Sequence, residues 1–128
     1  LEGGVVAIFL ERLARGEETT IFGDGTQSRD FAYVDDVIAA MLATVGKTGG
    51  PYNVGTGEDT TVSQLHDACA KVAGVAATPQ FEDARLGDVQ RSVLDVALIE
   101  RELGWRAQVR LDDGLRRTWA WMQDHGSA

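Results

Sequence analysis

Apolar residues that recur at helical spacing, interrupted by short extended runs, are the feature that most constrains this fold. Helical spacing extends over five segments, and a glycine follows each of the first four: residues 5–15, 34–45, 61–73, 95–103 and 112–122. Extended runs fall between them, at residues 19–22, 29–34, 51–54 and 78–81. The alternation of these two periods predicts an α/β fold, in which several helices pack with short strands in one compact layer.

Composition and charge narrow the class of protein. The 128 residues carry a formal net charge of −8, with 12 Lys and Arg against 20 Asp and Glu. Nucleic acid requires clustered cations, and no basic stripe is present. No apolar run approaches the ~18 residues that a membrane helix needs. The single cysteine, Cys69, and two distant histidines predict neither a disulfide framework nor a metal site. We therefore expect a cytoplasmic protein of one domain, with no nucleic-acid partner and no membrane contact.

Local signals predict how several segments begin and turn. Residues 23–26 contain an Asp-Gly pair that favours a tight turn, so the extended runs on either side are expected to form a hairpin. Asp35 or Asp36 is expected to cap the helix that begins there, and Asp95 and Asp112 to cap the last two helices.

The segment from residue 61 to residue 92 carries further signals. Thr61 and Gln64 have the spacing of a capping box at the start of a helix. Cys69 lies on the apolar stripe of that helix and is expected in the core, whereas His66 lies on its flank and is expected to be solvated. Residues 82–92 lack a regular period and are expected to form a long loop.

A dinucleotide-binding site is not predicted from the glycines. Gly55-Thr56-Gly57 supplies the first two glycines of Gly-x-Gly-x-x-Gly, but Thr60 stands where the third belongs. The Tyr-x-x-x-Lys pair that many nicotinamide enzymes use for proton transfer is also absent from the sequence. We therefore expect no cofactor site, no metal and no catalytic residue in these 128 residues.

Three segments are typical of one enzyme family. In chain order they are IFGDGTQSRDFAYVDD at residues 21–36, YNVGTG at residues 52–57 and RLGDVQRS at residues 85–92. Asp95 and the sequence Leu103-Gly104-Trp105 follow the third segment. In this order and spacing they resemble the C-terminal half of the extended short-chain dehydrogenase/reductases, the NAD-dependent epimerase/dehydratase family. Within it the match is best to the branch of UDP-glucose 4-epimerases, and it covers nearly the whole chain.

The resemblance implies roles for five residues. Arg29 and Arg85 would contact the pyrophosphate of a UDP-sugar, and Asp88 a ribose hydroxyl. Backbone groups near Thr20 and Phe22 would contact the uracil. Guanidinium groups suit a pyrophosphate independently of the family, because they form charge-assisted and often bidentate hydrogen bonds.

The resemblance also implies partners. In that family an N-terminal Rossmann domain holds NAD and the catalytic residues, and we expect this domain to be missing from the sequence. The 128 residues are then expected to bind a UDP-sugar without converting it, while NAD belongs to the parent enzyme. The surface that meets the missing domain is expected to be exposed on the helix from Val5 to Arg15 and at Trp121, where it would favour homo-oligomers.

Other interpretations stay open at this point. The chain could be a stand-alone module that binds UDP-sugars, or a fragment of a dTDP-sugar dehydratase or a UDP-glucuronate decarboxylase. It could also be a structural piece that only self-associates. Taken without the resemblance, Arg29 and Asp30 are favoured as an ion pair, Arg85 and Asp88 suit a loop-closing pair, and Arg91 is expected to be solvated.

Overall fold

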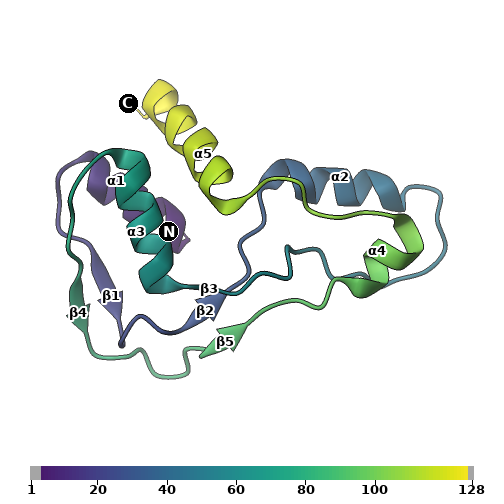
Figure 1. Ribbon diagram of the computed structural model, residues 1–128, viewed down its shortest axis with the longest axis horizontal. Helices are drawn as coiled ribbons and strands as arrows, with labels where there is room; N and C mark the ends of the chain where they lie inside the picture. Colours follow the sequence, from purple (N-terminus) through teal and green to yellow (C-terminus); the bar gives the residue numbers. More distant parts are fainter. Residues whose placement is uncertain (1–3, 127–128) are drawn as a thin grey trace.

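The fold combines five helices with five short strands. A computed structural model describes residues 4–126 (Figure 1). In chain order the elements are α1 (Val5–Ala14), β1 (Thr20–Phe22), β2 (Ser28–Arg29), α2 (Val34–Thr44), β3 (Thr60–Thr61), α3 (Val62–Ala73), β4 (Gln80–Glu82), β5 (Arg91–Ser92), α4 (Ala97–Leu103) and α5 (Leu111–His125). The α/β class predicted from the sequence is confirmed.

The strands form two small sheets. In one sheet β1 pairs with β4 in parallel, and in the other β2 lies between antiparallel β3 and parallel β5. The hairpin expected around residues 23–26 is therefore wrong, since β1 and β2 belong to different sheets. The turn itself is present: Asp24 accepts hydrogen bonds from the backbone and the hydroxyl of Thr26, which lower the pKa of its carboxyl. Gly23 and Gly25 both have positive φ, a conformation that glycine adopts without steric cost.

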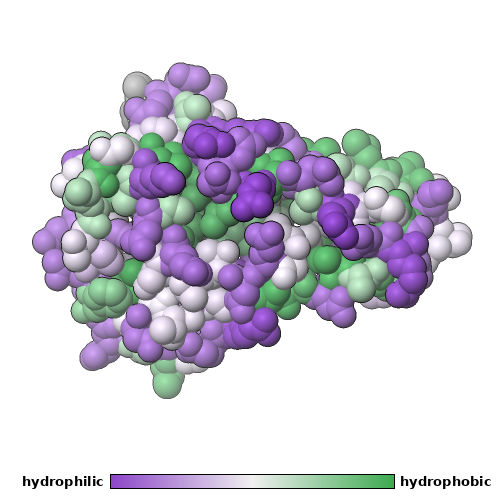
Figure 2. Space-filling model, in the orientation of Figure 1, coloured by the Kyte–Doolittle hydropathy of each residue, from purple (hydrophilic) through white to green (hydrophobic). Residues whose placement is uncertain are grey.

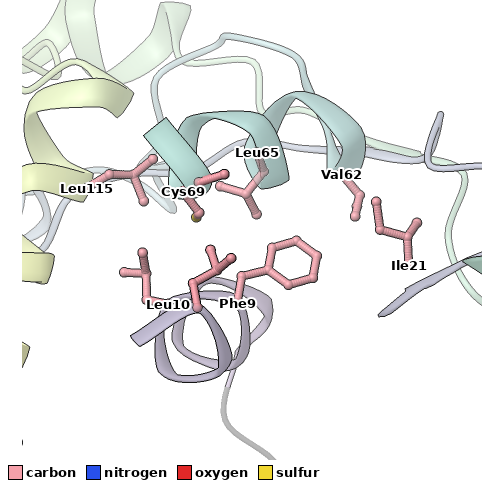
Figure 3. Packing of buried hydrophobic residues seen from close by; sticks show 9 residues of the cluster. Phe9, Leu10, Ile21, Val62, Leu65, Cys69 and Leu115 are labelled. Atoms are coloured by element: carbon pink, nitrogen blue, oxygen red, sulfur yellow. The ribbon is translucent and has the colours of Figure 1, made fainter. Parts of the chain in front are cut away.

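The larger core lies where α1, α3 and α5 meet β1. Phe9 and Leu10 of α1 face Leu65 and Cys69 of α3 (Figure 3). Ile21 of β1 and Leu115 of α5 complete the same cluster. The apolar face of α1 is thus buried against α3, and the expectation that this helix is exposed is wrong.

A second core lies at the other end of the molecule, where α2 and α4 meet (Figure 1). It contains Ala40, Ile99 and Trp105, and the indole N–H of Trp105 donates to the backbone oxygen of Asp36. The single compact layer expected from the sequence is therefore divided into two clusters. The connecting segments divide their apolar side chains between the two: Phe31 packs against the larger cluster, and Val54 and Val96 against the smaller one.

The outward face of α2 is apolar. Four of its large hydrophobic residues and Val45, which directly follows it, are 49–73% exposed; the four are Val34, Ile38, Met41 and Leu42. Figure 2 shows hydrophobic surface over this helix. The same residues have the helical spacing that the sequence assigned to a buried face, whereas the side buried in the fold is that of Asp36 and Ala40. Trp121 of α5 is also exposed, as expected.

Asp36 is a buried link between distant segments rather than a helix cap. Helix α2 begins after Tyr33 without a side-chain cap, so the capping role expected for Asp35 or Asp36 is wrong. The Asp36 carboxylate accepts hydrogen bonds of 2.9 Å from the backbone N–H groups of Gln108 and Val109. It therefore fixes the segment that joins α4 to α5.

Other expected caps and strands have mixed outcomes. Asp95 accepts from the backbone N–H of Ala97, but the residue before α4 is Val96. Asp112 lies inside the first turn of α5, which begins after Arg110, so its capping role is wrong. Residues 51–54 form no strand, because no neighbouring segment pairs with them. The strand expected at 78–81 is present as β4, shifted by about two residues.

Helix α3 is built as the sequence predicts, apart from His66. Thr61 and Gln64 form the reciprocal capping box, and Gly74 ends the helix in the left-handed conformation. Cys69 is buried, but His66 is fully buried as well, so its expected solvation is wrong. His66 can be buried because the hydroxyl of Thr19 gives its imidazole a polar partner inside the core.

The thiol of Cys69 is expected to be inert in the folded protein. Burial raises its pKa to about 12, so almost no thiolate forms near neutral pH, and the thiolate is the reactive species. A thiol reagent added at about pH 8 should label the native chain hardly at all and the urea-unfolded chain once. Rapid labelling of the native chain would contradict this burial.

A candidate ligand cavity beside strand β1

A cavity of about 410 Å³ lies beside β1, and we call it the β1 cavity. All five residues singled out from the sequence line it: Thr20, Phe22, Arg29, Arg85 and Asp88. They come from β1, from β2 and from the loop that follows β4. The fold thus brings the two arginines to one concavity, although 56 positions separate them in the sequence. Their roles as ligand contacts remain predictions.

The pairing of β1 with β4 decides which backbone groups face the cavity. The Thr19 oxygen accepts from Gln80, and the Gly23 N–H donates to Glu82, so both point toward β4. The N–H and C=O of one residue point to the same edge of a strand, and successive residues alternate. The polar backbone groups of Thr20 and Phe22 therefore point to the opposite, unpaired edge of β1. A flat ligand with donors and acceptors on its rim can bind such an edge.

Gln27 forms a hydrogen bond with one of these backbone groups. Its side-chain N–H donates to the Phe22 oxygen at 2.6 Å, and its own backbone oxygen accepts from Val62. Gln27 is buried and lines the β1 cavity. The Thr20 C=O and the N–H groups of Thr20 and Phe22 are left to face a ligand. Sequence reasoning did not single out Gln27, because an uncharged residue in a turn carries no signal of its own.

Arg29 is held at the cavity by Asp88. Its Nη2 lies 2.6 Å from the Asp88 carboxylate, and its Nη1 donates to the backbone oxygens of Ser28 and Val89. The ion pair expected between Arg29 and Asp30 is wrong, because Arg29 pairs with Asp88 while Asp30 accepts from the backbone of Thr56 and Gly57. The backbone N–H of Asp88 donates to the backbone oxygen of Arg85, so the loop between them is closed by a backbone hydrogen bond. Arg91, expected to be solvated, is exposed but bonds Asp59.

Arg85 lies over the ring of Phe22. The guanidinium carbon is 4.0 Å from the ring centroid, a distance at which cation–π attraction orients the planar group. The stacked ring holds Arg85 at the same end of the cavity as β1. Two guanidinium groups and one carboxylate therefore border the same space, in a chain whose overall charge is negative. An anion is attracted here by local contacts rather than by the field of the whole protein.

The glycine turn before α3 does not fit the pyrophosphate of a dinucleotide. The Asp30 carboxylate accepts from the backbone N–H groups of Thr56 and Gly57 and from the Thr56 hydroxyl. A Cβ at Gly55 would lie 2.6 Å from an Asp30 oxygen. Because the half-buried Asp30 carboxylate already occupies the N–H groups that a phosphate would need, these residues serve the fold. Their structural role is the one that the sequence favoured.

A second cavity of about 410 Å³ lies between residues 56–60 and 106–111. It contains none of the predicted residues, and its Arg106 is bonded to Glu100. No helix among residues 4–126 is long and apolar enough to cross a membrane. Over the same range no three potential metal ligands gather.

Comparisons with known proteins identify similar chains. A family model described as GDP-mannose 4,6 dehydratase matches residues 4–118. The UDP-glucose 4-epimerase of Mycolicibacterium smegmatis is 46% identical over 119 residues, which are 91% of this chain and 38% of that protein. A putative UDP-glucose 4-epimerase of Methanocaldococcus jannaschii is 36% identical over 124 residues, covering 97% of this chain and 40% of its own length.

Solved structures of UDP-glucose 4-epimerases are also similar to this chain. The crystal structure of a UDP-glucose 4-epimerase from Thermotoga maritima with UDP-glucose has a TM-score of 0.95 and 42% identity, over 99% of this chain and 41% of that one. A UDP-glucose 4-epimerase from Thermus thermophilus in complex with NAD has a TM-score of 0.85 and 37% identity, over 98% of this chain and 41% of that one. The chain thus spans about two fifths of the length of the relatives it matches.

Proposed function

Since the chain belongs to the GDP-mannose 4,6 dehydratase family of NAD-dependent epimerases and dehydratases, we propose that its β1 cavity binds the nucleotide of a UDP-sugar. The chain would serve as the nucleotide-sugar-binding portion of a UDP-glucose 4-epimerase-like isomerase, which interconverts UDP-glucose and UDP-galactose. The observation that carries this proposal is the meeting of an unpaired strand edge, two guanidinium groups and a carboxylate at one cavity.

Each wall of the cavity suits one part of the ligand. The free edge of β1 offers a C=O at Thr20 and an N–H at Phe22, which match the ring N–H and a carbonyl of uracil. Arg29 and Arg85 supply the cationic donors that a pyrophosphate needs. The cavity volume of about 410 Å³ lies within the range of small-molecule sites.

Binding would rearrange the pair between Arg29 and Asp88. In the unliganded chain the two neutralise each other at 2.6 Å. A pyrophosphate replaces the carboxylate as the partner of Arg29, and Asp88 is then available to accept from a ribose hydroxyl. Because Arg29 and Asp88 would each exchange one polar partner for another, neither charge would be left unpaired, and the cost of desolvation would stay low.

We assign no catalytic step to residues 4–126. NAD supplies hydride transfer in enzymes of this kind, yet the glycine turn of this chain is occupied by Asp30, as described above. We propose that NAD and the acid–base residues belong to another part of the parent enzyme. The sugar is expected to meet that part as well, since the cavity residues account only for the nucleotide.

The first experiment is calorimetric titration of residues 1–128 with UDP-glucose and, separately, with NAD. We expect binding of UDP-glucose in the micromolar range, no binding of NAD and no conversion of UDP-galactose. GDP-mannose is the matched competitor, because the family model carries its name while the edge of β1 suits uracil. Failure to bind UDP-glucose would refute the proposed function, as would tighter binding of GDP-mannose. Binding of NAD or turnover by this chain would refute its expected inactivity.

A further inference from the structure

A buried hydrogen bond connects α3 to the strand that borders the β1 cavity. Nε2 of His66 and the hydroxyl of Thr19 share this bond at 2.7 Å, and both side chains are almost fully enclosed. Thr19 directly precedes Thr20, the first residue of β1. Any movement of the imidazole is therefore transmitted to the backbone that presents its edge to the ligand.

The ring of His66 also supports the cavity wall. It packs edge-to-face against Phe9 of α1, with ring centroids 5.2 Å apart, and Phe9 itself lines the β1 cavity. The imidazole thus contacts the surroundings of the cavity at two points, once through a hydrogen bond and once through an aromatic ring.

The other ring nitrogen, Nδ1, has no hydrogen-bond partner among residues 4–126. The charged group closest to it is Asp67 on the same helix, at 3.8 Å and exposed to solvent. Burial lowers the pKa of His66, and Asp67 offsets only part of this effect. Charged groups on the elements packed around it have other partners or are exposed. Strand β1 has none, and Asp113 of α5 pairs with Arg116 and Arg117. Glu11 and Arg12 of α1 are exposed, as is Arg15 directly after it.

We propose that His66 is a positioning residue for the base-binding edge of β1, which it fixes through Thr19 when neutral and releases when protonated. This inference rests on the proposed function for its effect on ligand binding, but not for its effect on β1. The protonated imidazole carries N–H groups on both nitrogens, with no acceptor for Nδ1 among residues 4–126, and it places a charge in an apolar core. Opening of the contact between α3 and β1 relieves both costs.

The direction of the pH effect follows from the lowered pKa. A group whose pKa is lower in the folded chain stabilises the fold above its ordinary value, about 6.5 for histidine, and this contribution is lost as the pH falls toward the folded value. We therefore expect the β1 edge to be fixed at neutral pH and to loosen in mild acid.

The test compares UDP-glucose binding at about pH 7.5 and about pH 5.5. UDP-glucose is chosen because both of its phosphates are esterified and do not titrate in this window. The wild-type chain should bind more than about twofold more weakly at the lower pH, and His66→Gln, which can still donate to Thr19 but does not titrate, should change less than about twofold. The matched control is His125→Gln, which removes the other histidine and should leave the wild-type profile unchanged.

Amide resonances of residues 20–22 give a second measurement that needs no ligand. They should shift with a midpoint below about pH 6.5 in the wild-type chain and stay constant in His66→Gln. Thr19→Val, which removes the hydroxyl and keeps the shape, should weaken UDP-glucose binding at neutral pH roughly two- to tenfold. The same pH profile in wild type and His66→Gln, or amides of β1 that ignore pH, would overturn the inference. If UDP-glucose binds at neither pH, the proposed function fails, and the amide shifts still decide the role of His66.

Discussion

Replacement of Arg29 or Arg85 by alanine is expected to weaken UDP-glucose binding by about 1.5–3 kcal/mol each, the range for hydrogen bonds to charged groups. This corresponds to roughly a ten- to hundredfold rise in Kd. For Arg29→Ala the loss also leaves Asp88 without its partner, so a carboxylate faces the pyrophosphate. For Arg85→Ala the stacking on Phe22 is lost together with the charge. Calorimetric titration at neutral pH measures both effects.

Two kinds of variant control this result. Arginine-to-lysine substitutions should restore only part of the affinity, because an ammonium lacks the planar fork. Arg116→Ala on the exposed side of α5 changes the net charge equally and should alter Kd less than about twofold. Equal losses in Arg116→Ala would show that overall charge, not the cavity, governs binding. Unchanged affinity in Arg29→Ala and Arg85→Ala would remove both residues from the site.

Asp36→Ala is expected to cost about 3 kcal/mol of unfolding free energy, the largest stability effect we expect from a single substitution in this chain. The side chain is 4% exposed, and it accepts from two backbone N–H groups of the segment between α4 and α5. Its loss leaves the N–H groups of Gln108 and Val109 without their acceptor. Urea unfolding followed by circular dichroism measures the change.

The neighbouring Asp35 is the matched control for this prediction. It is exposed and lies 3.7 Å from Arg117, a surface pair that contributes little. Asp35→Ala should therefore change the unfolding free energy by less than about 0.5 kcal/mol. Similar losses in the two variants would show that helix propensity or charge, rather than the buried hydrogen bonds, determines the effect.

Sequence patterns predicted the structure correctly where a feature depends only on residues that are close together in the chain. The capping box of Thr61 and Gln64, the stop at Gly74 and the turn at Asp24 each depend on residues within a few positions, and all are present. The helix at residues 34–45 was also found, but its buried side was not. Periodicity shows that one face of a helix is apolar; it does not show what covers that face.

The sequence does not predict hydrogen bonds between side chains and groups that are far away in the chain. Asp30, Asp36 and His66 were interpreted through their immediate neighbours as an ion pair, a cap and a solvated residue. Each instead bonds to groups 26 to 73 positions away. The candidate site was located because its motif could be matched to a family, and the edge of β1 became visible only once its pairing with β4 was known.

The parallel pairing that shapes the cavity has a consequence for how the chain reaches its native state. Thr20 pairs with Gln80, and Ser28 with Arg91, so both pairings close loops of roughly 60 residues, which is slow because the entropy is lost before contacts compensate for it. Helices α1 and α3 can each form locally before either closure. The cavity then forms late in folding. A nucleotide that binds it therefore slows unfolding and does not speed the earlier collapse of the chain.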